Sequence, residues 1–167
     1  WLEKFRGAEA RIHRITGLML SPHYGVSKLQ WCLQNLPAVA AARDSRDLVF
    51  GPLAAFLVCR LSDGAPLQAD PANASRTLLF NIHTLSWDEE LLTLLDIPKN
   101  ILPEVKSSSE IYGHTAHMLA AHSIPIAGIA GDQQAALFGQ AGHSAGSLKC
   151  TYGTGAFILL NTGFKKQ

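Results

Sequence analysis

The chain has 167 residues, of which 47% are hydrophobic and 16% are charged, and its formal net charge is +1. This length and composition allow a buried core and exclude a disordered protein. The near-neutral charge argues against binding to nucleic acid or to an anionic membrane surface, since both need a basic patch. The longest apolar run, residues 48–59, is too short to cross a bilayer. The three cysteines lack a paired spacing, which indicates reduced thiols and a cytoplasmic protein.

The first part of the chain is predicted to be helical. Apolar residues recur at helical spacing from Leu2 to Ile12, and this spacing resumes between Leu29 and Leu36. A later segment is apolar on nearly every side, which is typical of a helix buried between neighbours. The helices predicted from these patterns cover residues 2–15, 26–36, 37 to about 42, and 48–61.

The middle of the chain mixes turns with one strand and two helices. Residues 62–76 have the composition of a long loop, and 77–85 have the β-branched and aromatic content of a strand. Ser86 and Glu89 have the spacing of a capping box, which predicts a helix that begins there and ends before Pro98. After an irregular connection, a short helix is predicted over 114–122.

The last part alternates strands with a helix. Residues 124–130 are predicted to form a buried strand, and 132–140 a helix with Asp132 at or beside its N-terminal cap. Residues 146–163 alternate like two strands joined by a turn at 152–155. Strands interleaved with helices place the chain in the α/β class.

Asp132 is the first candidate for a chemical role. It lies between a predicted strand and a predicted helix, which is where ligands tend to bind in open α/β sheets. A helix N-terminus favours the ionised carboxylate, which can then take a proton from a bound hydroxyl. The alternative is that Asp132 only caps the helix.

The glycine-rich turn is the second candidate. Gly153, Thr154 and Gly155 can present backbone N–H groups and a hydroxyl to a phosphate, because glycine allows a close approach. The alternative is a hairpin turn with no ligand. A candidate base and a candidate phosphate loop in one chain suggest phosphoryl transfer to a hydroxyl.

The histidines are weaker candidates. His114, His117 and His122 lie close together in the sequence, but no cysteine or carboxylate completes a recognisable set of metal ligands. Surface histidines without a metal are therefore expected.

Three long segments resemble the glycerol kinases within the FGGY family of carbohydrate kinases. These are "GIAGDQQAALFGQ" at 128–140, "TYGTGAFILLNTG" at 151–163 and "NASRTLLFNIHTLSWDEELLTLLDIPKNILPEVKSSSEIYG" at 73–113. The resemblance covers essentially the whole chain. It implies part of an actin-like, ribonuclease H-like ATPase fold, and a kinase that uses ATP and Mg²⁺ to phosphorylate glycerol or a related small polyol or sugar.

The resemblance also implies roles for individual residues. Asp132 would be the general base, and Gln133 and Phe157 would contact the acceptor. The Gly153–Gly155 turn, with Thr154 at its centre, would lie at the transferring phosphate. His23 stands where glycerol kinases carry an acceptor-contacting tyrosine, so the acceptor itself is in question. No protein metal ligand is assigned.

The resemblance further implies a division into two family domains. Residues 1–142 would be the C-terminal part of the first domain, and 143–167 would begin the second. Because Trp1 opens the chain without a methionine and the chain is about a third of a family member, a fragment is expected, inactive by itself. The parts holding the Mg²⁺-binding aspartate and the adenosine would lie outside these 167 residues.

Two rival hypotheses remain open. One is a non-catalytic relative that binds a polyol as a sensor, which the histidine at position 23 favours. The other is a stable structural unit that associates with itself as a homo-oligomer through exposed apolar surface.

Overall fold

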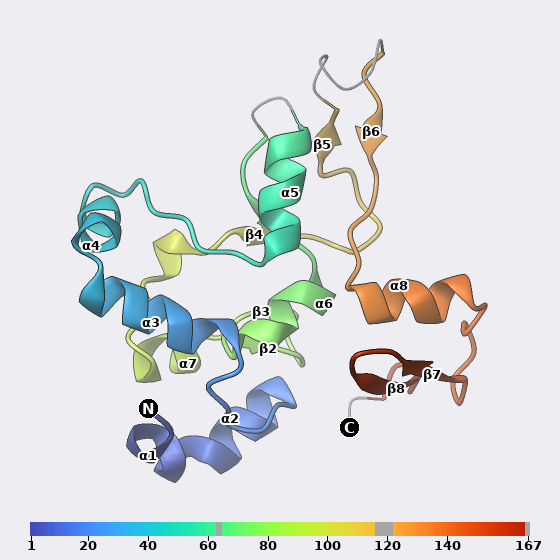
Figure 1. The fold of residues 1–167 in the computed structure, drawn as a ribbon, viewed down its shortest axis with the longest axis horizontal. Helices are drawn as coiled ribbons and strands as arrows, with labels where there is room; N and C mark the ends of the chain where they lie inside the picture. Colours follow the sequence, from blue (N-terminus) through green and yellow to red (C-terminus); the bar gives the residue numbers. More distant parts are fainter. Residues whose placement is uncertain (63–64, 116–121, 166–167) are drawn as a thin grey trace. The chain divides into compact units, whose positions relative to one another are not determined.

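The computed structural model describes residues 1–62, 65–115 and 122–165 (Figure 1). These residues form two compact units, Trp1–Ile129 and Ala130–Gln167, and each is described by itself. The predicted mixture of helices and strands is confirmed. The predicted family-domain boundary after residue 142 is a different division and stays a prediction.

The first unit contains seven α-helices and three 3-10 turns within its described residues. The α-helices are α1 (Leu2–Phe5), α2 (Glu9–Thr16), α3 (Gly25–Asn35), α4 (Pro37–Asp44), α5 (Leu53–Leu61), α6 (Pro71–Ala74) and α7 (Glu89–Leu94). The 3-10 turns are η1 (Arg6–Ala8), η2 (Ser75–Thr77) and η3 (Lys99–Ile101).

Short strands in the first unit pair two by two. They are β1 (Gln68–Ala69), β2 (Phe80–Asn81), β3 (Ser86–Trp87), β4 (Glu104–Val105), β5 (Gly113–His114) and β6 (Pro125–Ile126). The pair β1 and β4 is parallel, whereas β2 with β3 and β5 with β6 are antiparallel. These pairs hold segments together locally, and most of the packing comes from helices.

The predicted N-terminal helix is present but divided. The turn η1, with Gly7 at its centre, separates α1 from α2. Helix α2 ends at Thr16 and is capped by Gly17, whose φ of 70° is left-handed and whose N–H donates to the carbonyl of His13 at 2.7 Å. Glycine suits this position because it reaches positive φ without steric cost.

The main hydrophobic core lies between α2, α3, α7 and the segments that follow η2 and α7. Its buried members are Phe5, Ile12, Ile15, Val26, Leu29, Leu78, Leu79, Leu91, Leu92, Leu95, Ile97 and Ile101. Gln30 is also buried, and its Nε2 donates to the carbonyl of Leu95. Leucines and isoleucines make up most of this core, and those expected from the helical spacing at the start of the chain include Ile12 and Leu29.

The predicted capping box at Ser86 is wrong. Ser86 belongs to β3, where it pairs with Asn81, and the helix begins at Glu89. Asp88 is the N-cap, and its Oδ1 accepts from the N–H of Leu91 at 3.0 Å. An aspartate beside the helix start is at least as good a cap as a serine, so strand pairing decided between them.

The prediction of a fully buried helix over 48–61 is also wrong. Helix α5 begins only after Pro52, and it buries Ala55 and Val58. Leu53, Phe56 and Leu57 stay exposed, with 72%, 52% and 48% of their surface accessible. The helix therefore has one packed side, formed by small and β-branched residues.

Three other predicted elements changed. The loop over 62–76 contains β1, α6 and η2, and the strand over 77–85 shrinks to β2, followed by a tight turn. The buried strand predicted over 124–130 shrinks to β6, which is largely exposed, and Ile129, three residues after β6, is the one buried residue of that segment. Most of the predicted helix over 114–122 lies outside the described residues, and His114 lies in β5.

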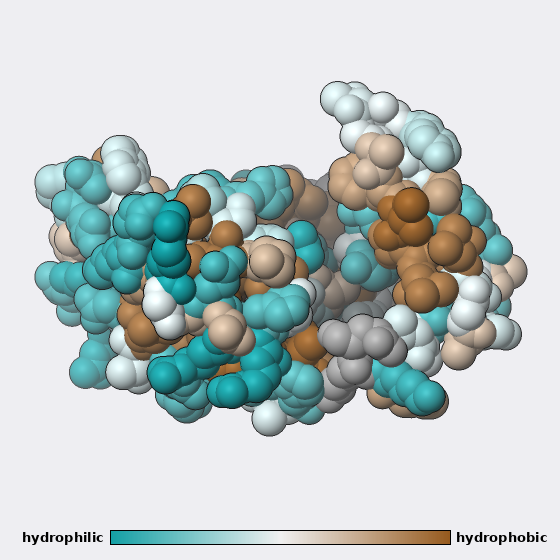
Figure 2. All heavy atoms as spheres, turned by 90° about the horizontal axis from the view of Figure 1, so that it is seen from below, coloured by the Kyte–Doolittle hydropathy of each residue, from teal (hydrophilic) through white to brown (hydrophobic). Residues whose placement is uncertain are grey.

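The second unit consists of one helix and one hairpin. Helix α8 (Asp132–Gly139) and the antiparallel strands β7 (Leu148–Tyr152) and β8 (Ala156–Leu160) confirm the predicted helix and hairpin. One face of the hairpin carries exposed apolar side chains, which include Leu148, Tyr152, Ile158 and Leu160. Hydrophobic side chains are also visible in brown on the surface that Figure 2 shows.

In the described part of the chain, every helix falls short of the length and apolar character that crossing a membrane would require.

Candidate functional site

Asp132 is the first residue of α8, and it does not cap this helix. The N-cap is Gly131, and no side-chain capping bond is formed there. The Asp132 side chain is exposed, and its Oδ2 accepts from Nε2 of Gln133 at 3.3 Å. The capping explanation for this aspartate is therefore wrong. An exposed carboxylate at a helix N-terminus remains able to accept a proton from a ligand.

Gln133 joins α8 to the hairpin. Its Oε1 accepts from the ammonium of Lys149 at 2.7 Å. The same ammonium donates to Oγ1 of Thr151, which lies 3.3 Å from Oε1 of Gln133. The carboxamide is thus held by its oxygen, while its nitrogen is directed to Asp132.

Lys149 and Thr151 were not found from the sequence. Alternation along β7 places them on one face and Leu148, Cys150 and Tyr152 on the other. Polar residues on a strand usually indicate a solvent face, but here Lys149 is only 3% exposed. The one available signal was that a lysine and a threonine share a face of the strand next to the glycine-rich turn.

Phe157 lies on the same face of the hairpin as Thr151. The two residues are direct partners in the antiparallel register, and side chains of directly opposed residues share a face. Phe157 is 49% exposed, so part of its ring is open to a ligand. The second unit therefore brings together three of the predicted site residues, with Asp132 and Gln133 on α8 and Phe157 on β8.

The turn between β7 and β8 is short and open. Thr154 is exposed at its tip, and the N–H of Gly153 donates to the carbonyl of Gly155 at 3.0 Å. A Cβ at position 155 would lie 3.0 Å from the Phe157 ring, so a side chain there would displace the aromatic. A Cβ built at Gly153 would have the carbonyl oxygen of Gly155, at 3.9 Å, as its nearest neighbour among the described residues. The open backbone fits a phosphate group that approaches closely.

His23 lies in the first unit, on the loop before α3. Its exposed ring meets Tyr24 edge to face, with 5.7 Å between the ring centroids. The Lys28 ammonium bonds to the carbonyls of Pro22, His23 and Tyr24, which fixes the loop. Arg76 stacks on the Tyr24 ring at 5.0 Å. The backbone around His23 is thus anchored while its side chain stays accessible.

The structure offers no protein cage for a metal within its described residues. No three histidine, cysteine or carboxylate side chains there lie close enough to hold an ion. His117 lies outside the described residues, and His114 is exposed in β5. Magnesium bound here would need ligands other than these described side chains.

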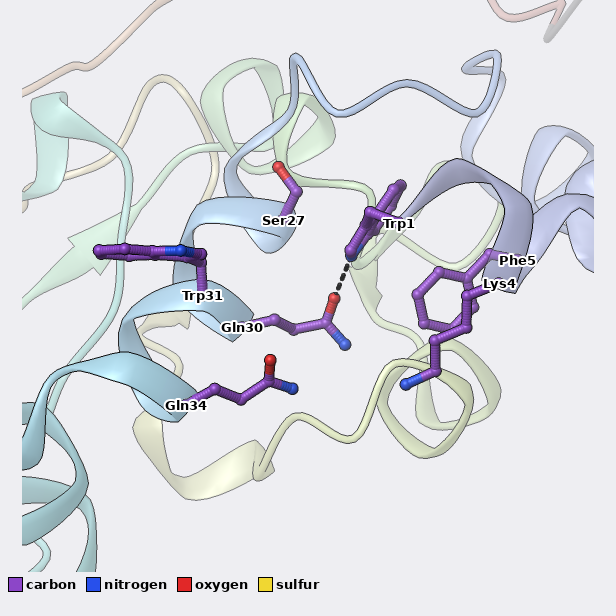
Figure 3. A pocket seen from close by; sticks show the side chains of 7 residues that line it. All are labelled: Trp1, Lys4, Phe5, Ser27, Gln30, Trp31 and Gln34. Carbon is purple, nitrogen blue, oxygen red and sulfur yellow. Dashed lines mark hydrogen bonds between the residues drawn. The ribbon is translucent and has the colours of Figure 1, made fainter.

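A cavity of about 360 Å³ lies in the first unit (Figure 3). It is lined by Trp1, Lys4, Phe5, Ser27, Gln30, Trp31 and Gln34. A hydrogen bond from the Trp1 indole to Oε1 of Gln30 joins its two sides. No residue predicted for the site contributes to this lining.

Comparison with known proteins extends these observations. Residues 1–139 match the FGGY family of carbohydrate kinases, N-terminal domain. A glycerol kinase of Enterococcus casseliflavus is 48% identical over 165 residues, which are 98% of this chain and 33% of that protein. A glycerol kinase of Dichelobacter nodosus is 52% identical over 157 residues, which are 93% of this chain and 32% of that protein. The chain thus spans about a third of the length of these relatives.

The solved structures that resemble this chain are also carbohydrate kinases. The glycerol kinase of Plasmodium falciparum, solved with ADP, superposes with a TM-score of 0.87 and is 39% identical, covering 94% of this chain and 31% of that one. A ligand-bound xylulose kinase of Lactobacillus acidophilus superposes with a TM-score of 0.74 at 25% identity, covering 93% of this chain and 31% of the other.

Proposed function

Because the chain belongs to the FGGY family of carbohydrate kinases, we propose that it supplies the acceptor side and the catalytic base of an ATP-dependent kinase. The expected actin-like, ribonuclease H-like fold is confirmed by the superposition on a glycerol kinase. The acceptor is glycerol or a related small polyol or sugar. The observation that carries the proposal is Asp132, a carboxylate that begins α8 without capping it and lies beside Gln133.

Asp132 acts as the general base in this mechanism. It removes the proton from the acceptor hydroxyl, whose oxygen forms a bond to the γ-phosphorus of ATP. The bond from that phosphorus to the bridging oxygen breaks, and ADP leaves with the electron pair. The proton ends on the Asp132 carboxylate.

The other residues position the two substrates. Gln133 donates from Nε2 to an acceptor oxygen, and the exposed part of the Phe157 ring packs against the carbon skeleton. Thr154 and Gly155 meet the transferring phosphate, since the N–H of Gly153 is already bonded within the turn. ATP supplies the phosphoryl group, and Mg²⁺ would neutralise its charge through ligands outside the described set. Holding both reactants in line accounts for most of the catalysis.

Glycerol is the first acceptor to test. The relatives at 48% and 52% identity are named glycerol kinases, which favours glycerol over larger sugars. Other small polyols remain candidate acceptors because of His23, whose imidazole offers a ring nitrogen where the phenol of a tyrosine would offer a hydroxyl.

We place the protein in the cytoplasm, in keeping with three cysteines that are all free thiols. Assembly into a homo-oligomer stays a prediction.

The test uses a chimera in which this chain replaces the matching 165 residues of the Enterococcus casseliflavus glycerol kinase. ADP release is measured with glycerol and with a panel of polyols and ketoses. Loss of a general base in Asp132→Asn should lower kcat by about a hundredfold or more. Asp96→Asn makes the same change at an exposed carboxylate in the first unit and should leave kcat unchanged.

The 167-residue chain by itself should show no sustained acceptor-dependent turnover, since a third of a kinase cannot enclose both substrates. If the chimera is active and its kcat is unchanged by Asp132→Asn, the assignment of Asp132 as the general base is refuted. A chimera that binds polyols without turning over would favour the non-catalytic sensor, which His23 alone supports.

A further inference from the structure

The second unit contains a buried cation, the ammonium of Lys149, and its burial does not stabilise the fold. The Lys149 side chain is 3% exposed, and no ion pair of this lysine occurs in the described part of the chain. Its ammonium is compensated by two neutral oxygens, those of Gln133 and Thr151. Burying an ammonium without a carboxylate is unfavourable, and an apolar side chain would pack there at lower cost. The lysine therefore needs another reason to be present.

The contacts of Lys149 determine which way the Gln133 carboxamide points. A carboxamide has one accepting and one donating end, and Lys149 can only donate. With Oε1 held by the ammonium at 2.7 Å, Nε2 faces Oδ2 of Asp132 at 3.3 Å. The opposite orientation would place the NH₂ against the ammonium and the carbonyl against the carboxylate, which is unfavourable at both ends.

We propose that Lys149 is a positioning residue for acceptor recognition, and that it makes Gln133 a hydrogen-bond donor toward the acceptor. The proposal rests on the proposed function, because it concerns the same acceptor site. Of the two Nε2 hydrogens, one is directed to Asp132 and the other is available for an acceptor oxygen. The ligand class that fits is a polyol with a second hydroxyl close to the reacting one.

The register of the hairpin connects the contact between Lys149 and Gln133 to the rest of the site. Thr151 accepts from Lys149 and is the cross-strand partner of Phe157. The same pairing therefore positions the aromatic that packs on the acceptor and the hydroxyl that holds the lysine. A slip of either strand by one residue would move that strand's side chain to the other face of the hairpin and separate Thr151 from Phe157.

The experiment compares Lys149→Met with Lys165→Met in the chimera described above. Lys165 is an exposed lysine of the same unit, so its replacement removes the same charge away from Gln133. Because bonds to charged groups are strong, Lys149→Met should raise KM for glycerol about tenfold or more. KM for ATP should stay within about twofold of the parent value, since the ATP contacts are unchanged. Lys165→Met should change neither constant.

A double-mutant cycle separates positioning from a general structural effect. If Lys149 acts through Gln133, then Lys149→Met should add almost nothing once Gln133→Leu is present. Additive effects of the two changes, or an unchanged KM for glycerol in Lys149→Met, would overturn the proposal. If Lys149→Met does not fold, Thr151→Val tests the same network, and it should raise KM for glycerol in the same direction.

A second readout does not depend on activity. In NMR spectra of the 167-residue chain, the Nε2 protons of Gln133 should have shifts distinct from those of exposed glutamines, and these should collapse to ordinary values in Lys149→Met. Identical shifts in both proteins would refute the positioning role. An inactive parent chimera would instead count against the proposed function, so the two failures are distinguishable.

Discussion

Two buried polar residues in the first unit organise the segment between β4 and β5. Asp70 is fully buried and accepts from the N–H and side chain of Asn73 and from the hydroxyl of Ser108. The Tyr112 hydroxyl donates to the carbonyls of Lys106 and Ser107 at 3.2 and 2.8 Å. Burial, the Asp70 carboxylate and then Glu110 raise the pKa of Tyr112 to about 12. These contacts replace regular secondary structure over 106–111.

Tyr112→Phe should destabilise the protein by about 1 kcal/mol at pH 7, because two carbonyls lose a shared donor. The folded pKa of Tyr112, about 12, lies above its ordinary value of 10.0. The stability that this phenol contributes is therefore complete below pH 10 and is lost as the pH rises through 12. Urea unfolding at pH 7, 9 and 11 should show the difference between the two proteins shrinking only at the highest pH. Tyr152→Phe, at an 85% exposed tyrosine, should have no effect on stability at pH 7 or 9.

At the scale of single elements, α7 shows how local signals compete. Ser86 and Asp88 are both favourable cap residues, and they are two positions apart. Pairing of β3 with β2 occupies Ser86, so the helix starts later, at Glu89. Asp88 also accepts from Nδ2 of Asn81 at 2.7 Å, which ties the cap to β2. The helix start is therefore selected by a contact outside the helix.

Asp88→Ala should lower the free energy of unfolding by about 1 to 2 kcal/mol, because the cap bond to Leu91 and the bond from Asn81 are both lost. Ser86→Ala should cost less than about 0.5 kcal/mol, since among the described residues its exposed hydroxyl bonds only to the exposed hydroxyl of Thr84. Urea denaturation of both variants measures the difference. If Ser86→Ala lowers the free energy of unfolding as much as Asp88→Ala or more, Ser86 would be the helix cap after all.

At the scale of the whole molecule, hydrophobic burial is uneven. Every buried hydrophobic residue in the described part of the chain lies at or before Ile129. The three hydrophobic clusters found among the described residues, including the small one around Val58 and Tyr112, belong to the first unit. The second unit contributes Lys149 as its buried residue in the described range. Burial of apolar surface is the main driving force of folding, so the two units should differ in their independence.

A chain of residues 1–129 should therefore unfold cooperatively, with a Tm close to that of all 167 residues. A chain of residues 130–167 should show no cooperative transition by itself, because a helix and one hairpin without a buried core are marginal in water. Circular dichroism during heating measures both. A truncation at 129 that unfolds gradually would show instead that the second unit is needed for the core.

Much of the fold could be predicted because its signals are local. Apolar spacing identified α2 and α3, and alternation about a glycine-rich turn identified β7 and β8. The predictions failed where a partner distant in the sequence decides the outcome. The strand over 77–85 ends at Asn81 because β3 returns against β2, and α5 leaves Phe56 exposed because only its small residues face a neighbour.

The candidate site divides in the same way. The sequence by itself determined the family, the α/β class and the residues proposed for the site, because long motifs around Asp132 and the Gly153–Gly155 turn carry them. Only the tertiary structure decided that Asp132 does not cap α8 and that Lys149 is buried against Gln133. The alternation of side chains along β7 and β8 predicts that the hairpin has two different faces. Which of these faces is buried depends on how α8 packs on the hairpin. That packing joins residues sixteen positions apart, beyond the reach of any local pattern.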